Sequence, residues 1–319
     1  MTHCIIAREY EGGVIALDSG LLRAEMAACY LLECGDRVAI IETGIHASVE
    51  RILEVLARRG WQPGQVSHVI VTHVHLDHAG GAGALMQSLP AAVLVAHPYG
   101  ARHVIDPSRL EASARAVYGD EVFEATYGRL VPVDASRVIT MDDGASLNVG
   151  QRRLSFIDTP GHARHHFCVW DEQTRGWFSG DTFGVSYRDL DSAVGPFLFP
   201  TTTPTQFDPD ALIQSVQRLM AQSPRFMYLT HFGRVAATDR LVRQMIDGVK
   251  QFRALGERHV HAENRTAAIR TDMLSWLVDQ IRPTGVRQTD EQLRSLLRDD
   301  VILNTQGVEY WLDHRSTGV

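Results

Sequence analysis

Short apolar segments and amphipathic segments alternate along the first half of the chain. Runs rich in β-branched residues and bounded by turn residues predict buried strands. These runs are Val14–Leu17, Ala28–Glu33, Arg37–Ile41, Val69–Thr72 and Ala92–Ala96. Between them, Ser48–Arg59 places its apolar residues on one helical face and is followed by Gly60, which predicts a helix and its end. Residues 98–130 show only a weak helical spacing of hydrophobic residues, and we expect two or three short helices there.

The strand pattern continues through the middle of the chain. Further short strands are predicted at Arg137–Met141, Ala145–Val149, Arg153–Asp158, Phe167–Trp170 and Gly176–Ser179. Residues 195–204 contain three prolines and no helical period, which predicts a loop. A helix over 209–221 and a buried strand at Phe226–Thr230 are expected to follow.

From about Ala236 onward the pattern becomes helical. The expected helices are Thr238–Phe252, Thr266–Ile281 and Thr289–Leu297. The last begins with a capping box, in which Thr289 is the N-cap and Gln292 stands three residues later. We therefore predict an α/β domain over residues 1–235 and a helical C-terminal appendage over residues 236–319.

Composition narrows the class of protein. The chain has 319 residues, 45% of them hydrophobic, and a formal net charge of -7. This acidic balance argues against a nucleic-acid or anionic-membrane partner, which would need clustered Lys and Arg. No signal peptide is apparent, and no apolar run reaches the ~18 residues of a membrane helix. The four cysteines lack C-x-x-C spacing and predict buried thiols in a reducing compartment: Cys4, Cys29, Cys34 and Cys168.

These features predict a cytoplasmic protein. We expect a small-molecule substrate and no nucleic-acid or membrane partner. A homodimer is an open alternative, because exposed apolar positions of the C-terminal helices can pack on a second subunit as well as on the first domain.

Histidines are bunched rather than dispersed. Directly after a strand pattern comes the run His73-Val74-His75-Leu76-Asp77-His78. Residues two apart share a face of an extended segment, so His73 and His75 can bind one cation together. If the chain then turns into a helix, Asp77 and His78 point to a second position. Imidazole and carboxylate ligands without sulfur suit zinc, iron or manganese. The alternative is a polar turn with hydrogen-bonded histidines.

The segment from Thr72 to Gly80 resembles the signature of the metallo-β-lactamase superfamily. The resemblance implies an αββα sandwich with two metal ions at the strand ends, and it predicts further ligands in a fixed chain order. Matching segments are Asp158-Thr159-Pro160-Gly161-His162, Ser179-Gly180-Asp181-Thr182 and Thr230-His231-Phe232-Gly233. The resemblance covers residues from about 10 to 235 and leaves the helical tail outside.

The same resemblance assigns the ligands. The first metal would be bound by His73, His75 and His162, the second by Asp77, His78 and His231, and Asp181 would bridge both. One position departs from the family pattern, because Glu42-Thr43-Gly44 stands where Asp-Thr-Gly is usual. The usual Asp supports the ligands by hydrogen bonds from behind. A Glu is one methylene longer, so this support must be rearranged.

Two divalent ions about 3.5–4 Å apart can share a water and lower its pKa toward ~7, which predicts a bridging hydroxide as the nucleophile. We expect Asp77 and Asp181 to be the catalytic carboxylates, with Asp77 orienting the hydroxide. Candidate substrate contacts are His165, His166, Tyr187 and Phe197. Each has a structural alternative: core-facing strand positions for the histidines, a surface tyrosine for Tyr187, and packing under the appendage for the loop around Phe197.

The sandwich with a helical tail resembles glyoxalase II, a thiolester hydrolase, which implies a thiolester or other acyl-ester substrate. The segment after Asp181 departs from that enzyme, reading Thr182-Phe183-Gly184-Val185-Ser186-Tyr187 where a Gly-Cys-Gly type is expected. The competing hypothesis is a mononuclear-iron sulfur dioxygenase that acts on a persulfide. A binding-only relative is a third class, but the complete ligand set argues against it. Zinc is the expected metal, with iron or manganese as alternatives. We expect the tail to affect substrate affinity or stability more than metal content.

Overall fold

The computed structural model describes residues 5–202 and 204–315, and these form two compact units. Of the described residues, unit 1 takes those within Met1–Asp158, His165–Gly180 and Pro224–Arg234, and unit 2 takes those within Thr159–Arg164, Asp181–Ser223 and Val235–Val319. The two units therefore interleave along the chain. The domain boundary between residues 235 and 236 stays a prediction.

Among the described residues, seven strands form the first sheet in their sequence order. They are β1 (Ala7–Tyr10), β2 (Val14–Asp18), β3 (Ala28–Cys34), β4 (Arg37–Ile41), β5 (Val66–Ile70), β6 (Val93–Ala96) and β7 (Val138–Thr140). Strands β1 to β4 pair antiparallel, whereas β4 to β7 pair parallel. The carboxyl ends of β4, β5 and β6 consequently meet at one edge of the sheet.

The second sheet has the order β13-β12-β11-β10-β9-β8. Its strands are β8 (Ser146–Val149), β9 (Arg152–Asp158), β10 (Phe167–Asp171), β11 (Gly176–Gly180), β12 (Phe226–Leu229) and β13 (Gly233–Ala236). Strand β10 is antiparallel to both β9 and β11, and β11 is parallel to β12. Strands β9, β11 and β12 thus all end at the same edge.

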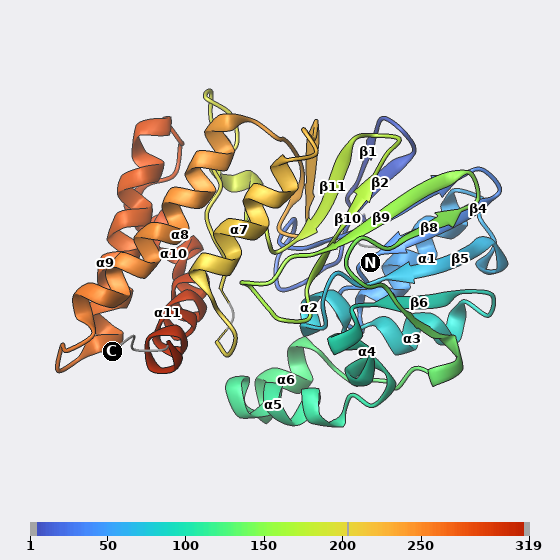
Figure 1. The fold of residues 1–319 in the computed structure, drawn as a ribbon, viewed down its shortest axis with the longest axis horizontal. Coiled ribbons are helices and arrows are strands. Elements are labelled where there is room, and N and C mark those ends of the chain that lie inside the picture. The colour runs from blue at the N-terminus through green and yellow to red at the C-terminus, as the bar shows by residue number, and fades with distance from the viewer. Residues whose placement is uncertain (1–4, 203, 316–319) are drawn as a thin grey trace. The chain divides into compact units, whose positions relative to one another are not determined.

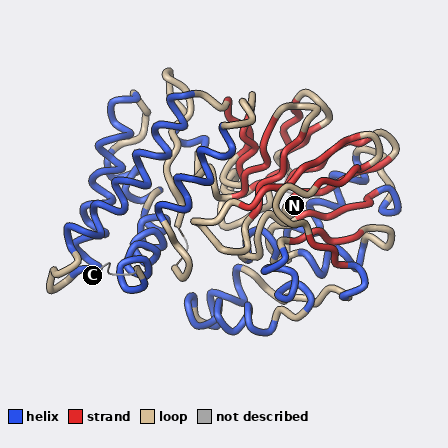
Figure 2. Tube along the Cα trace, in the orientation of Figure 1, coloured by secondary structure: helices blue, strands red, loops and turns tan. Residues whose placement is uncertain are grey.

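The two sheets pack face to face in unit 1, with an apolar core between them (Figures 1 and 2). The alternation of side chains along β3 produces this layering. Tyr30 and Leu32 face the core between the sheets, whereas Cys29 and Leu31 belong to a second core on the other face of the first sheet. That outer face is covered by helices α1, α3 and α4, which supply apolar residues to the second core.

The helices of unit 1 all follow strands of the first sheet. They are α1 (Ser48–Arg58), α2 (Leu76–Ala79), α3 (Ala82–Ser88), α4 (Pro98–Ile105), α5 (Ser108–Tyr118) and α6 (Asp120–Thr126). The expected short helices over 98–130 are confirmed as α4, α5 and α6. The strand expected at Val69–Thr72 instead lies at Val66–Ile70, so the histidine run begins three residues beyond its end.

Unit 2 is helical. It contains α7 (Pro209–Met220), α8 (Asp239–His259), α9 (Arg265–Ile281), α10 (Asp290–Leu296) and α11 (Arg298–His314). Helices α8, α9 and α11 pack on one another. The capping box at Thr289 and Gln292 is confirmed at the start of α10. Helix α8 is longer than expected, and α11 was not predicted, because its apolar residues do not gather on one clear face.

The packed sheets, their flanking helices and the C-terminal helices confirm the predicted fold class. Cys29, Cys34 and Cys168 are buried free thiols, as expected, and Cys4 lies outside the described residues. Among the described residues, no helix combines the length and apolarity that a membrane crossing requires.

Candidate metal centre

The histidine run spans a change from extended to helical backbone. His75 is the last extended residue, and α2 begins at Leu76. His73 and His75 therefore lie on extended chain, while Asp77 and His78 lie in the first turn of a helix. The sequence predicts that Asp77 and His78 point to a second cation position if the chain turns into a helix there. The structure has this turn.

Asp77, His78 and His231 converge within unit 1. Each offers a ligand atom, and these atoms lie within 4.8 Å of one another. The Nε2 atoms of His231 and His78 lie 3.1 Å and 3.5 Å from Oδ2 of Asp77. His231 reaches this position because β12 ends two residues before it, at Leu229. Asp77 has 24% of its side chain exposed, whereas both histidines are buried.

The other ring nitrogen of each histidine is occupied by a hydrogen bond. His231 Nδ1 lies 2.9 Å from the carbonyl oxygen of Met26, and His78 Nδ1 lies 3.0 Å from Oε1 of Glu42. A carbonyl or a carboxylate accepts, so Nδ1 carries the hydrogen and Nε2 keeps its lone pair for a cation. Both rings are thus held in the tautomer and orientation that metal binding through Nε2 requires.

Glu42 holds the ligand segment from behind. It is buried directly after β4, and it accepts hydrogen bonds from the hydroxyl and the backbone N–H of Thr72, the latter at 3.2 Å. The hydroxyl of Thr230 is 3.4 Å from the same carboxylate. Glu42 thereby joins the segments that carry His73, His78 and His231. Its backbone has a φ of 65°, a region that is uncommon for non-glycine residues. Glu42, which stands where the superfamily usually has Asp, therefore supports the histidine-bearing segments by hydrogen bonds from behind.

His73 and His75 face each other in unit 1. His73 Nε2 lies 2.8 Å from His75 Nδ1, and His73 Nδ1 lies 3.1 Å from the hydroxyl of Thr72. Two ring nitrogens at the shorter distance share either a proton or a cation. His166 stacks on His73 with ring centroids 4.8 Å apart, and the ring centroid of His165 lies 5.5 Å from that of His75. Both candidate substrate histidines therefore pack beside histidines predicted to be ligands.

Gly180 shows how tightly this region of unit 1 is built. A Cβ atom at this position would lie 2.5 Å from both His166 Nε2 and Thr72 Oγ1. Its φ of 47° is in addition unfavourable for other residues. A glycine is therefore required at the end of β11, immediately before Asp181.

His162 and Asp181 belong to unit 2. His162 Nε2 lies 3.3 Å from Oδ2 of Asp181, and both side chains are buried. His162 Nδ1 lies 3.2 Å from the carbonyl oxygen of Thr201, which again leaves Nε2 for a cation. Gly161 accepts a backbone hydrogen bond from Asp208 at the start of α7, which fixes the chain just before His162.

Tyr187 and Phe197 are both buried in unit 2. The interpretation of Tyr187 as a surface residue is wrong, because its phenol donates to Oδ1 of Asp300 on α11 at 2.9 Å. Phe197 belongs to a loop in which Phe199 pairs with Val185 and Pro200 packs against Gly248 of α8. This packing accounts for the apolar loop, and substrate contact by Tyr187 or Phe197 stays a prediction.

The sequence interpretation missed two tyrosines close to Asp77. Tyr118 and Tyr127, with ring centroids 5.5 Å apart, are near enough to Asp77 for its charge to act on them. Burial, and then the negative charge of Asp77, raise the pKa of the Tyr118 hydroxyl, so it remains a neutral donor. These tyrosines lie in or directly after short helices without a clear hydrophobic period, so the sequence did not indicate that they are close to Asp77.

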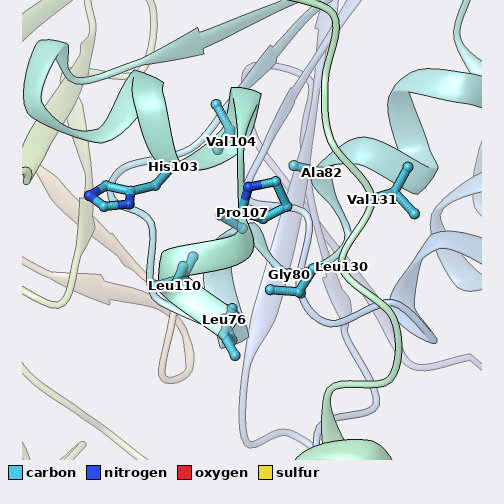
Figure 3. A pocket seen from close by; sticks show the side chains of 10 residues that line it. Leu76, Gly80, Ala82, His103, Val104, Pro107, Leu110, Leu130 and Val131 are labelled. Atoms are coloured by element: carbon cyan, nitrogen blue, oxygen red, sulfur yellow. The ribbon is translucent and has the colours of Figure 1, made fainter. Parts of the chain in front are cut away.

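A small pocket in unit 1 is lined by residues that include Leu76 and Leu110 (Figure 3). Its lining is apolar apart from His103 on α4, and within the described residues none of the seven predicted ligands contributes to it. This pocket is therefore separate from the ligand cluster.

The donor set fits divalent metal ions. Among the described residues, imidazole nitrogens and carboxylate oxygens converge without thiolates, and His78 and His231 have Nδ1 anchored and can offer Nε2 to a cation. This chemistry is compatible with zinc, iron or manganese.

The sequence profile of the metallo-β-lactamase superfamily matches residues 22–231. The chain belongs to this superfamily. A metallo-β-lactamase-fold-containing protein of Sulfurisphaera tokodaii is 27% identical over 216 residues, which cover 66% of this chain and 75% of the relative. A hydroxyacylglutathione hydrolase of Methylococcus capsulatus is 29% identical over 131 residues, 41% of this chain and 38% of that enzyme.

The fold of the superfamily is also found by structural comparison. The crystal structure of an archaeal metallo-β-lactamase superfamily protein from Sulfolobus tokodaii superposes with a TM-score of 0.64 and 22% identity. The match covers 93% of this chain and 98% of that one. The superfamily consists largely of hydrolases, and it binds divalent metals through His and Asp residues of the kind clustered here.

Proposed function

We propose that this chain is a dinuclear metal-dependent hydrolase that cleaves a thiolester or another acyl-ester bond. The observation that carries the proposal is the convergence of Asp77, His78 and His231 with both Nδ1 atoms anchored. A buried cluster of imidazoles fixed in one tautomer is suited to metal binding and has no evident structural purpose.

We further propose that His162 and Asp181 of unit 2 complete the first metal position with His73 and His75, and that Asp181 bridges both metals. The topology of the second sheet supports this assignment. Strands β9, β11 and β12 end at one edge, and His162, Asp181 and His231 follow these ends by four, one and two residues. Residues that follow strands ending at one edge are suited to serve as ligands of a shared metal centre, which supports the proposal.

When bound, two divalent ions, with zinc the expected metal, would supply a hydroxide at neutral pH and polarise the carbonyl of the substrate. The protein's own contribution begins with Asp77. Its partial exposure gives its carboxylate access to both the ligand cluster and solvent, so it can orient the nucleophile and hold a proton for the leaving group. The buried shell of Glu42 and Thr72 keeps the ligands in place and excludes water from behind.

A thiolester or ester substrate is proposed from chemistry and from likeness together. The hydroxyacylglutathione hydrolase relative is named for hydrolysis of an acyl–sulfur bond. Neutral phenols at Tyr118 and Tyr127 beside Asp77 are suited to donate to a polarised carbonyl. A small-molecule substrate, the absence of nucleic-acid and membrane partners, a cytoplasmic location and a homodimer all stay predictions.

The test combines metal analysis with a substrate panel. Elemental mass spectrometry of freshly purified protein should give close to two equivalents of zinc, and hydrolysis should be detected with a glutathione thiolester or an aryl ester. The His75→Ala variant should lose this activity. One equivalent of metal, mostly iron, together with persulfide-dependent oxygen uptake would contradict the hydrolase assignment and favour the sulfur dioxygenase. Absence of bound metal and of both activities would overturn the enzyme assignment.

A further inference from the structure

Helix α11 reaches the ligand His162 through a continuous set of hydrogen bonds within unit 2. The buried side chain of Asn304 accepts from the backbone N–H of Thr202 at 2.7 Å and donates to the carbonyl of Pro200 at 3.3 Å. The hydroxyl of Thr202 donates to the backbone carbonyl of Asn304 at 3.3 Å. One asparagine therefore binds the chain on both sides of Thr201.

Thr201 is the residue whose carbonyl faces His162. Its oxygen lies 3.2 Å from His162 Nδ1, and its orientation depends on the two peptide units that Asn304 holds. The carbonyl selects the tautomer in which Nε2 is free of hydrogen. Neither Pro200 nor Thr201 can rotate its carbonyl without breaking a contact to α11 or to His162.

We propose that Asn304 is a positioning residue for His162, acting through Thr201, and that the last helix is thereby part of the support of the first metal position. This inference rests on the proposed role of His162 as a metal ligand. It gives α11 an influence on metal binding, where the sequence had led us to expect an effect on substrate affinity or stability.

Removal of a partner behind a metal-binding histidine typically weakens metal binding about 10–100-fold. Asn304→Ala should therefore raise the Kd of the first-position Zn²⁺ by about this factor in a competition titration with a chromophoric chelator. Asn304→Asp keeps the volume and the oxygen that accepts from Thr202, and it should restore part of the affinity. Both variants are made in the full chain, and thermal unfolding of the metal-free protein verifies that they fold.

The matched control lies on the same helix. Thr305 is equally buried, but its hydroxyl donates to the carbonyl of Val301 within α11 at 2.7 Å. Thr305→Ala should lower thermal stability and leave the Zn²⁺ affinity unchanged. His162→Ala identifies which of the two Zn²⁺ equivalents belongs to the first position.

The outcomes separate this inference from the proposed function. Wild-type affinity in Asn304→Ala, with a defect in His162→Ala, would overturn the role of Asn304 alone. Equal losses of affinity in Asn304→Ala and Thr305→Ala would also overturn it, because they would indicate general destabilisation. Two Zn²⁺ bound at wild-type affinity by His162→Ala would instead overturn the ligand assignment on which the proposed function rests.

Discussion

The Oε1 atom of Glu42 lies 3.0 Å from Nδ1 of His78, with both side chains almost completely buried. A carboxylate at this distance keeps the hydrogen on Nδ1 and raises the basicity of Nε2. The same carboxylate accepts from Thr72 and lies near the hydroxyl of Thr230. Glu42 is one methylene longer than the usual Asp, and its carboxylate connects the segments that follow β4, β5 and β12.

Shortening this side chain tests the relationship. We expect Glu42→Asp to weaken metal binding at the second position about 10–100-fold, because a shorter carboxylate cannot keep its contacts to both His78 and Thr72. The measurement is a Zn²⁺ competition titration with a chelator. Glu33→Asp makes the same chemical change at an exposed position of β3 and should leave the affinity unchanged. Equal affinity in both variants would show that the length of Glu42 is unimportant.

Loss of a ligand should be more severe than loss of its support. We expect His75→Ala to lower kcat/KM by more than the ~100-fold upper range typical of outer-shell changes, while the far-ultraviolet circular dichroism stays that of the wild type. His75 is only partly buried, so we expect its removal to leave the fold intact. The exposed His261 provides the control, since His261→Ala should retain full activity. Near-wild-type turnover by His75→Ala would contradict the ligand assignment.

The sequence indicates the candidate ligands clearly because their signal is local, and their role as ligands stays a prediction. His73, His75, Asp77 and His78 fall within six residues, and the change to helix at Leu76 separates them into two positions as their spacing indicated. The supporting residues could not be predicted in the same way. The carbonyl oxygens of Met26 and Thr201 hold His231 and His162, and any residue type carries a carbonyl.

The fold shows the same division. Strands with continuous apolar runs, such as β3 and β4, were predicted within one or two residues because burial dictates their composition. Strand β1 was missed because most of its residues are exposed, and α11 was missed because its apolar residues are spread around the helix. Besides the buried apolar Val301, Val308 and Leu312, the contacts of α11 include hydrogen bonds of Asp300 and Asn304, which its sequence does not mark as buried.

The buried ion pair of Arg152 and Asp171 should contribute to folding stability but not to metal binding. Arg152 donates to both carboxylate oxygens of Asp171 at 2.8 Å and 2.6 Å, and it also donates to the carbonyl of Gly12. Asp171→Ala leaves a buried guanidinium without its counter-ion, so the free energy of unfolding should fall by ~3–5 kcal/mol in urea denaturation. Metal content should not change, because Arg152 begins β9, at the strand end opposite the one His162 follows.

The control for this change is an exposed pair on α1. Glu54 pairs with Arg58 one turn away at the surface, and Glu54→Ala should cost less than ~1 kcal/mol. A similar small loss in Asp171→Ala would mean that the Arg152 guanidinium finds new partners or solvent. Loss of bound metal in Asp171→Ala would mean that the two ends of β9 are coupled.

Acidification should destabilise the chain through His103, which borders the pocket in Figure 3. Burial, followed by the positive charges of Arg102 and Arg109, lowers the pKa of His103 below its ordinary value. The unfolded chain therefore takes up this proton first as the pH falls through about 6.5, and the folded state loses stability below that pH. We expect the free energy of unfolding of metal-free wild type to fall more between pH 7.5 and 5.5 (about one unit either side of that value) than that of His103→Gln. Parallel pH profiles of the two proteins would show that His103 titrates alike in the folded and unfolded chains.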